Sequence, residues 1–378
     1  MRNFKIINFA IEHKKPDYKI NKSKGFIQWG TNNNYPEELL DMFNFEGSNL
    51  HQSIINKKTQ MIAGNGVVPT AENQTIVDNE FNEDDLDTIA YKLAYDYELF
   101  NGFAYEIIYS RDGKSIAEVN HIPFQNVRRG VKNDEIDYDY FWLSSDWTKY
   151  RKGEYEPEFI KGYDKTDTRS KQLVYVMDYN PQAQIYPIPY YSNAINWISL
   201  DWHIGQFHLA NAENGYSPSV ILNFSTGIPT EEEMDDFERD FDRKYKGSQN
   251  AGKMVLTFSN GQDEKPELIP VQLNDSDERF LLLDKQVQQN VLTAHNVTSP
   301  TLFGIYQPSA LGSKNEMIEA LDIFNSTYVS KRQTKIEKNL TRVLGVDIEL
   351  EPFVLENLEV IEDTPAEAEE LNNKKIIL

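Results

Sequence analysis

Apolar side chains recur every three or four residues in several long stretches, the pattern of helices that bury one face. The last of these stretches opens with a capping box at Ser313 and Glu316 and ends before Gly345, a favoured C-terminal cap. The sequence predicts helices at residues 35–43, 49–63, 84–100, 192–214, 230–245, 276–294 and 313–344.

Shorter stretches alternate apolar and polar residues, as half-buried strands do. Residues 132–171 are rich in Asp, Tyr and Lys and show little periodicity, so irregular loops are expected there, and the Pro-rich residues 186–189 indicate a boundary. Strands are predicted at residues 104–109, 116–122, 173–177, 220–224, 253–258 and 267–273.

The order of these elements predicts an α+β fold. A mixed region is followed by a helix, a small α/β module, a second helix, a loop with two prolines and two glycines, and a long helix. We found no internal repeat.

Charge and composition exclude several classes of function. With 60 acidic and 38 basic side chains the chain carries a formal charge of −22, so its average surface repels phosphate and tight binding of free nucleic acid is not expected. The absence of cysteine excludes disulfides and thiolate zinc sites and fits synthesis in a reducing cytoplasm. No signal peptide and no run of about 18 apolar residues is visible, so neither export by that route nor a membrane span is expected.

The sequence offers no pattern for catalysis, a metal or a cofactor. It lacks the Gly-x-x-x-x-Gly-Lys-Ser/Thr phosphate loop, so ATP hydrolysis is not expected. The closest histidines, His203 and His208, are five residues apart, which misaligns them on a helix for one metal ion. The acidic residues 134–139 lack the glycine and terminal glutamate of a calcium loop, and a solvated loop is predicted there. Asp84 and Asp85 lie at a predicted helix start, where capping explains them.

Four local motifs, in order along the chain, carry a family resemblance. Glu98 to Tyr105 precedes the turn at residues 111–114, and Asn214 to Leu222 joins an Asn-Gly pair to a strand. Lys244 to Lys253 contains Tyr-Lys-Gly followed by Asn-Ala-Gly-Lys, and residues 295–304 read His-Asn-Val-Thr-Ser-Pro-Thr-Leu-Phe-Gly. Together with the order of elements, these motifs resemble the portal proteins of tailed phages over roughly residues 85 to 345.

The resemblance implies a ring-shaped channel, usually a dodecamer, at a capsid vertex. It divides the chain into an N-terminal wing at 1–191, a stem helix at 192–214, a clip at 215–274, a second stem helix at 275–296, a tunnel loop with a long wing helix at 297–344, and a short C-terminal crown or tail at 345–378. The implied partners are other copies of the chain, the terminase large subunit, the major capsid protein, a head-tail adaptor, and double-stranded DNA bound without sequence specificity. The implied location is the virion, after synthesis in the host cytoplasm, with no membrane, cofactor or catalytic residue.

The resemblance also implies roles for particular residues. The expected tunnel-loop residues facing DNA are Ser299, Pro300, Gly304, Gln307, Ser309, Gly312, Ser313 and Lys314. The expected clip contacts with neighbouring subunits or terminase are Glu231, Glu232, Arg239, Arg243, Lys246 and Lys253. A plain connection between two helices is the alternative interpretation of the loop, and a solubilising surface is the alternative for the acidic side chains.

Two other functions fit the composition less well. A virion adaptor or minor capsid protein would share the acidity and ring assembly but not the order of elements. A carbohydrate-active hydrolase would use the abundant aromatic and acidic residues and would turn over substrate as a monomer.

Overall fold

The computed structural model describes residues 18–21, 25–77, 84–132, 135–150, 153–213, 220–224, 254–258, 267–270, 276–305 and 314–354. The chain forms two compact units, one of residues 1–57 with 95–297 and the other of residues 58–94 with 298–378. It passes from one unit to the other after residues 57, 94 and 297.

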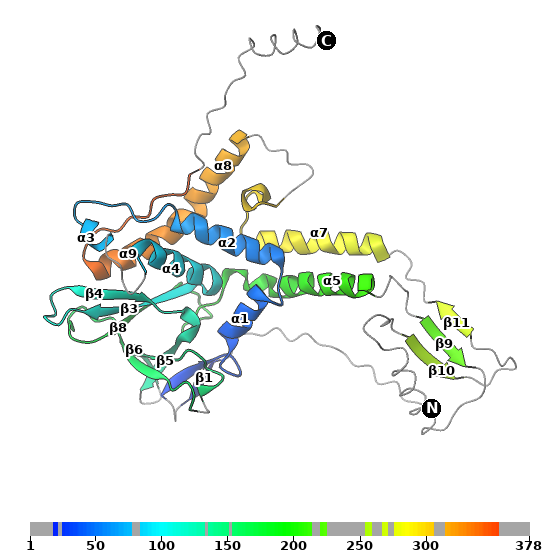
Figure 1. Cartoon of the computed structure of the whole chain (residues 1–378), viewed down its shortest axis with the longest axis horizontal. Coiled ribbons are helices and arrows are strands. Elements are labelled where there is room, and N and C mark those ends of the chain that lie inside the picture. Colours follow the sequence, from blue (N-terminus) through cyan, green and yellow to red (C-terminus); the bar gives the residue numbers. More distant parts are fainter. Residues whose placement is uncertain are drawn as a thin grey trace, which may run out of the picture. The chain divides into compact units, whose positions relative to one another are not determined.

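The first unit is built on an eight-stranded sheet (Figure 1). Its neighbouring strands are antiparallel except for the parallel pair β7 and β8. In spatial order the strands are β1 (Tyr18–Asn21), β2 (Phe26–Trp29), β5 (Val127–Lys132), β6 (Glu135–Leu143), β7 (Glu158–Gly162), β8 (Gln172–Met177), β3 (Gly102–Tyr109) and β4 (Ile116–His121).

The predicted hairpin of β3 and β4 and the strand β8 are confirmed, but the prediction of irregular loops over residues 132–171 is wrong for β6 and β7. Residues 135–139, predicted to be a solvated loop, belong to β6. Asp and Tyr alternate in β6 before the apolar end at Phe141 and Trp142, and this alternation carries strand periodicity although its acids disguise it. Phe141 is buried, and Tyr140 stacks on Phe159 of β7 at 4.9 Å between ring centroids.

Helices of the first unit include α1 (Tyr35–Asn44), α5 (Ile195–Glu213), α7 (Ser276–Ala294) and the short 3-10 turns η1 (Phe124–Asn126) and η3 (Tyr190–Ala194). The helices α2 (Asn49–Ala63) and α4 (Leu86–Phe100) contribute residues to both units. These bounds confirm the predicted helices to within three residues, apart from the predicted helix at 230–245, which lies outside the described residues.

A buried arginine joins the middle of the sheet to the start of α1. Arg128 of β5 is fully buried, and its guanidinium donates to Asn33 Oδ1 at 2.7 Å and to the Asn33 carbonyl at 2.8 Å. It also donates to the carbonyl of Gln125 at 2.6 Å and lies 4.8 Å from the ring centre of Trp147. Backbone oxygens and an aromatic face therefore replace the water that the charge has lost. Burial raises the pKa of Glu37, although the carboxylate lies 3.7 Å from the Arg128 guanidinium, which lowers it.

The second unit is mainly helical. Besides its shares of α2 and α4 it contains α3 (Gln74–Val77), η4 (Pro300–Phe303), α8 (Lys314–Phe324) and α9 (Ser330–Leu344). The start of α4 confirms the predicted capping by Asp85, because Asp85 Oδ1 accepts from the Thr88 amide at 2.7 Å. Hydrogen bonds from the Thr88 side chain and from its amide lower the pKa of Asp85. Asp84 instead pairs with Lys92 at 2.6 Å.

The predicted continuous helix from 313 to 344 is interrupted by the π-helical turn η5 (Asn325–Val329). Its predicted end is confirmed, since Gly345 adopts a left-handed φ of 75° and donates to the Thr341 carbonyl. Beyond it, residues 347–351 lie against the loop after α2, where Val67 and Leu350 form a β-bridge. Gly64 is required in this contact, because its φ is +63° and a Cβ there would lie 1.8 Å from the Glu351 carbonyl oxygen.

We predict that Arg128→Lys lowers the free energy of unfolding by about 3 kcal/mol, because an ammonium cannot replace the planar set of donors or the contact with Trp147. Chemical denaturation at fixed protein concentration measures this change. The control is Arg342→Lys at an exposed position of α9, where a change within about 0.5 kcal/mol is expected. Equal, small effects at both positions would contradict the proposed role of Arg128.

Candidate functional site

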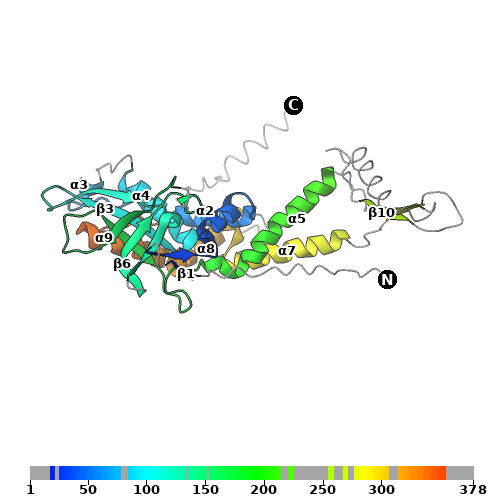
Figure 2. The same ribbon diagram turned by 90° about the horizontal axis from the view of Figure 1, so that it is seen from below.

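The helices α5 and α7 pack against each other in the first unit and carry the chain to and from a small sheet. Figure 2 shows them closest at the start of α5 and the end of α7 and diverging from there. Ile198, Val287 and Val291 are fully buried, as the apolar spacing predicted. Leu209, near the end of α5, is 52% exposed.

The helix pair exposes large apolar side chains to solvent. Leu281 and Leu282 of α7 are 63% and 62% exposed, and Phe207 of α5 is 39% exposed. Leu282 is about half a turn from the buried side chains of Val287 and Val291 around the helix. Exposed leucines in such a group are typical of surfaces that another protein covers.

The small sheet confirms the three strands of the predicted α/β module. The central strand β9 (Val220–Phe224) pairs in parallel with β10 (Met254–Phe258) and antiparallel with β11 (Glu267–Pro270). A parallel pair needs a crossover connection, which fits the predicted helix between β9 and β10. The predicted clip contacts all lie outside the described residues: Glu231, Glu232, Arg239, Arg243, Lys246 and Lys253.

Only the first part of the predicted tunnel loop can be described. Pro300 begins the turn η4, which Ser299 precedes, and Gly304 ends it with a left-handed φ of 74°. No neighbour lies within 4 Å of a Cβ built on Gly304, so it is the backbone conformation that favours glycine there. Lys314 is the first residue of α8, while Gln307, Ser309, Gly312 and Ser313 lie outside the described residues.

Phe324 at the end of α8 and Tyr328 in the π-helical turn η5 belong to an aromatic stack that the sequence did not predict. Phe324 stacks on Tyr328 at 5.1 Å and meets Phe303 of η4 edge-on at 5.5 Å. The ammonium of Lys58, a side chain only 1% exposed, lies 4.0 Å from the centre of the Tyr328 ring. Arg332 is also buried and lies 5.4 Å from the same ring. Burial of a lysine and an arginine is uncommon, and no local pattern in the sequence indicates it.

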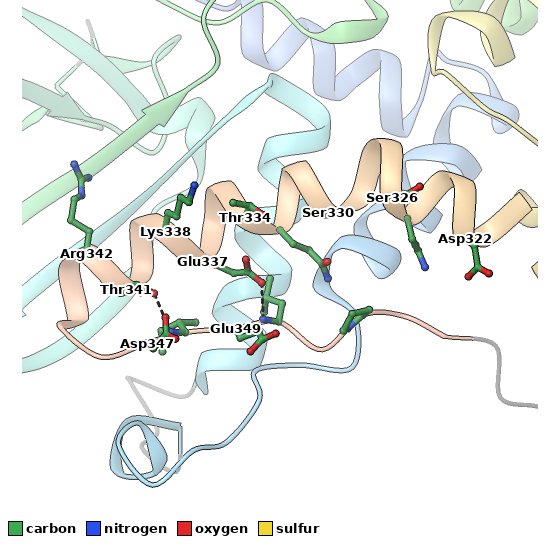
Figure 3. Close-up of a pocket in the computed structure, with 15 residues that line it drawn as sticks. Asp322, Ser326, Ser330, Thr334, Glu337, Lys338, Thr341, Arg342, Asp347 and Glu349 are labelled. Carbon is green, nitrogen blue, oxygen red and sulfur yellow. Dashed lines mark hydrogen bonds between the residues drawn. The ribbon is translucent and has the colours of Figure 1, made fainter. Parts of the chain in front are cut away.

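A groove of about 780 Å³ runs between α9 and the returning segment 347–352 (Figure 3). Glu337 Oε1 accepts from the Leu350 amide at 2.9 Å, and Thr341 Oγ1 accepts from the Ile348 amide at 3.0 Å. The two side chains of α9 thus accept hydrogen bonds from backbone amides of the returning segment. In a sheet, the carbonyls of a neighbouring strand would accept these bonds. Burial raises the pKa of Glu337, the Leu350 amide lowers it, and Glu349 and Asp347 raise it further.

The described residues offer neither a metal-binding group of side chains nor a membrane-spanning helix. Within the part of the chain that the structure describes, no group of three His, Asp or Glu side chains is arranged to hold a metal ion. Among the same residues, no helix is long and apolar enough to cross a membrane.

Comparison with known proteins identifies relatives of this arrangement. No family model matches the sequence. Over 176 residues the chain is 24% identical to the probable portal protein of Haemophilus phage HP1, and the match covers 46% of this chain and 49% of that protein. The matched region therefore spans about half the length of this curated relative.

Solved structures extend the likeness to most of the chain. The virion of a native gene transfer agent particle contains a chain with a TM-score of 0.55 and 14% identity, covering 90% of this chain and 89% of that one. The neck of the native particle, computed with C12 symmetry, gives a TM-score of 0.55 at 14% identity, covering 90% and 88%. An HK97 family phage portal protein from Corynebacterium diphtheriae gives a TM-score of 0.51 at 11% identity, covering 84% and 95%. These likenesses confirm the predicted resemblance: the chain has a mixed α+β fold like that of the HK97-type phage portal proteins.

We predict that Glu337→Ala lowers the free energy of unfolding by about 1 kcal/mol, because the Leu350 amide loses its acceptor. Glu337→Gln should be at least as stable as the natural chain at pH 7. An amide oxygen still accepts the bond, and the raised pKa means that the charged carboxylate is disfavoured in the fold. The stability linked to the protonated carboxyl is present below pH about 4.5 and is lost as the pH rises through the folded pKa.

Thermal unfolding of the three proteins between pH 4 and pH 7 checks this. The stability advantage of Glu337→Gln over the natural chain should shrink as the pH falls from 7 to 4. An alanine variant as stable as the glutamine variant at pH 7 would contradict the role of the hydrogen bond.

Proposed function

We propose that this chain, whose fold is that of the HK97-type portal proteins, is the subunit of a ring-shaped channel at a capsid vertex. The channel serves packaging and ejection of double-stranded DNA and connects head to tail. The observation that carries this proposal is the likeness to portal and neck structures over 84 to 90% of the chain.

The order of elements supports a division into portal regions. Residues 1–191 are assigned to the wing, α5 and α7 to the stem at 192–214 and 275–296, and residues 215–274 with their three-stranded sheet to the clip. Residues 297–344 are assigned to the tunnel loop and long wing helix, and 345–378 to a short crown or tail. Residues 58–94 share a compact unit with residues 298–378, which fits an assignment of the long helix to the wing.

Ring assembly needs two different complementary faces on each subunit. The exposed apolar side chains of α5 and α7 suit one such contact, since the neck of the gene transfer agent has twelvefold symmetry and a ring of this kind sets copies side by side. Among the described strands, β10 and β11 lie at the two edges of the small sheet, a position that suits pairing with a neighbouring clip. We therefore assign a homo-oligomer, with twelve subunits as the expected number.

The charge of the chain suits transport of DNA without retention. At −22 per subunit, a ring repels phosphate, so DNA can slide without sticking. The loop from Ser299 to Ser313 supplies the transient contacts, with Lys314 as its adjacent cation. Its glycines permit the backbone to move.

The remaining partners follow from what the channel requires. The sequence lacks a phosphate loop, so ATP hydrolysis by this chain is not expected, and we assign the energy supply for packaging to the terminase large subunit. The role that we propose for the chain itself is not enzymatic. The major capsid protein would surround the wing and a head-tail adaptor would meet the clip. The location is the virion at the portal vertex, after synthesis in the host cytoplasm, with no membrane involved.

The first test is native mass spectrometry with negative-stain imaging of the purified protein at moderate salt. A ring of about twelve subunits with a central hole is expected. A compact monomer under all conditions would contradict the proposed ring.

We predict that Leu282→Asp lowers the yield of rings at least tenfold, because burying one unpaired carboxylate at each interface is costly and is repeated around the ring. The matched control is Gln286→Asp, one turn further along the exposed surface of α7, which adds the same charge at an already polar position. Mass photometry of both variants beside the natural chain measures the ring fraction. Full assembly of the leucine variant would exclude this surface from the interface.

We predict that a shortened loop from Ser299 to Ser313 leaves ring assembly intact and reduces the DNA retained per particle. The loop contacts DNA but not the main interfaces in this assignment. Complementation with the shortened gene, followed by sizing of packaged DNA, measures the effect. Packaged DNA of normal length would leave only the interpretation of the loop as a connection between helices.

A further inference from the structure

Two buried histidines from opposite parts of the sequence form a hydrogen bond in the first unit. His51 Nδ1 and His295 Nε2 lie 2.9 Å apart, and the two side chains are 0% and 2% exposed. His51 lies in the first turn of α2, and His295 directly follows α7. The bond thus fastens the end of α7 to the start of α2.

Aromatic side chains enclose the pair. Tyr191 of η3 stacks on His295 at 5.3 Å between ring centroids and lies 4.6 Å from His51, while its hydroxyl donates to the Leu99 carbonyl at 2.7 Å. Phe43 of α1 meets His51 edge-on at 5.8 Å. The imidazoles are therefore held in position by packing and are shielded from water.

The backbone on either side fixes both imidazoles further. Ser48 caps α2, because its hydroxyl accepts from the His51 amide at 3.2 Å. At the other end Asn296 adopts a left-handed φ of 53°, and the Val297 amide donates to the Leu292 carbonyl at 3.0 Å, which closes α7. Both imidazoles thus belong to well-defined helix ends.

The chemistry of imidazole limits this contact to a narrow set of protonation states. One ring must donate and the other accept, so a second proton would set two N–H groups against each other at 2.9 Å in a buried site. When the pair carries one extra proton, the helix ends favour His295 as the charged ring and donor, because a positive charge is disfavoured at the N-terminus of α2 and favoured at the C-terminus of α7.

Other titratable groups surround the pair. Burial raises the pKa of Tyr191 well above its usual value, and Tyr35 and Glu98 act on the same phenol in that direction. Tyr95 of α4 meets the far side of Phe43 edge-on at 5.8 Å. Glu98 supplies the carboxylate among these neighbours, and it is 4% exposed.

We propose that His51 and His295 form a proton-sensitive latch that holds the end of α7 at neutral pH and releases it on acidification. In the unfolded or opened chain both imidazoles take up protons near pH 6.5, whereas the closed pair holds at most one. Well below pH 6.5 the open form therefore binds at least one more proton than the closed form. The closed form is favoured above pH about 6.5, and its equilibrium over the open form falls progressively below that pH, by about tenfold or more for each pH unit once both imidazoles of the open form are protonated.

The latch has a consequence at the place where the chain leaves the first unit. Val297 is the last residue of that unit and follows His295 by two positions. Release would free the segment from which the loop at 299–313 begins. This consequence for DNA rests on the proposed function, whereas the latch itself does not.

Hydrogen exchange with mass spectrometry on the full chain at pH 7.5, 6.5 and 5.5, corrected for the intrinsic pH dependence of exchange, tests the latch directly. Peptides from residues 287–297 and 48–56 should lose about threefold to thirtyfold in protection between pH 6.5 and pH 5.5, depending on whether the closed pair itself holds one proton. A peptide from β3 should keep its protection. Unchanged protection at the helix ends would overturn the proposal whether or not the protein forms rings.

Variants separate the pair from other acid effects. In the double variant His51→Gln and His295→Gln, amides can still share a hydrogen bond but do not titrate, so the pH dependence at the helix ends should vanish. Should the double variant fail to fold, His51→Gln alone should reduce it, since one imidazole then titrates against a neutral amide. The control His203→Gln removes an exposed histidine of α5 and should leave the natural profile. A double variant that keeps the full pH dependence, or a Glu98→Gln variant that abolishes it as completely as the double variant, would assign the effect elsewhere and overturn the latch.

Discussion

The chain leaves the large sheet along α5, builds a separate small sheet and returns along α7, so the returning helix end needs a fixed anchor. The buried contact of His51 with His295 supplies it, with Tyr191 stacked on His295 and packed at a tilt against His51. Three segments far apart in the sequence meet there: the start of α2, the turn before α5 and the end of α7. Without a defined contact at this point, the helix pair would be joined to the sheet only through its own packing.

Buried cationic side chains are the second recurring feature, and carbonyl groups or aromatic rings close to them in space take the place of water. Arg128 binds backbone carbonyls and an aromatic face in the first unit. Lys58 lies over Tyr328 in the second unit, beside the π-helical turn. A buried charge costs stability unless such partners are in place, and once in place they define one arrangement of the surrounding elements. The π-helical turn then has a structural explanation, since it brings Tyr328 both onto Phe324 and under the Lys58 ammonium.

The proposed function follows from arrangement rather than from any reactive side chain. The chain has a mixed α+β fold like that of the HK97-type portal proteins, in which a helix pair carries a small sheet and a long, interrupted helix follows. The acidic charge and the exposed leucines of α7 add the physical properties that a DNA-conducting ring needs, namely repulsion of phosphate and surfaces for neighbouring copies.

The sequence by itself determined the helices at 35–43, 49–63, 84–100, 192–214 and 276–294, six strands and the order of the elements, because side-chain periodicity and end signals such as Asp85 and Gly345 act over a few residues. It also revealed the family resemblance through short motifs. The strands β1, β2, β5, β6 and β7 of the large sheet were not predicted. In β6 acidic residues alternate with tyrosine, a pattern that resembles a solvated loop until the neighbouring strands are known. The sheet order and the burial of Arg128 and Lys58 were decided only by the tertiary structure. So was the meeting of His51 with His295, 244 positions apart, because no local pattern specifies which distant residues will share a desolvated site.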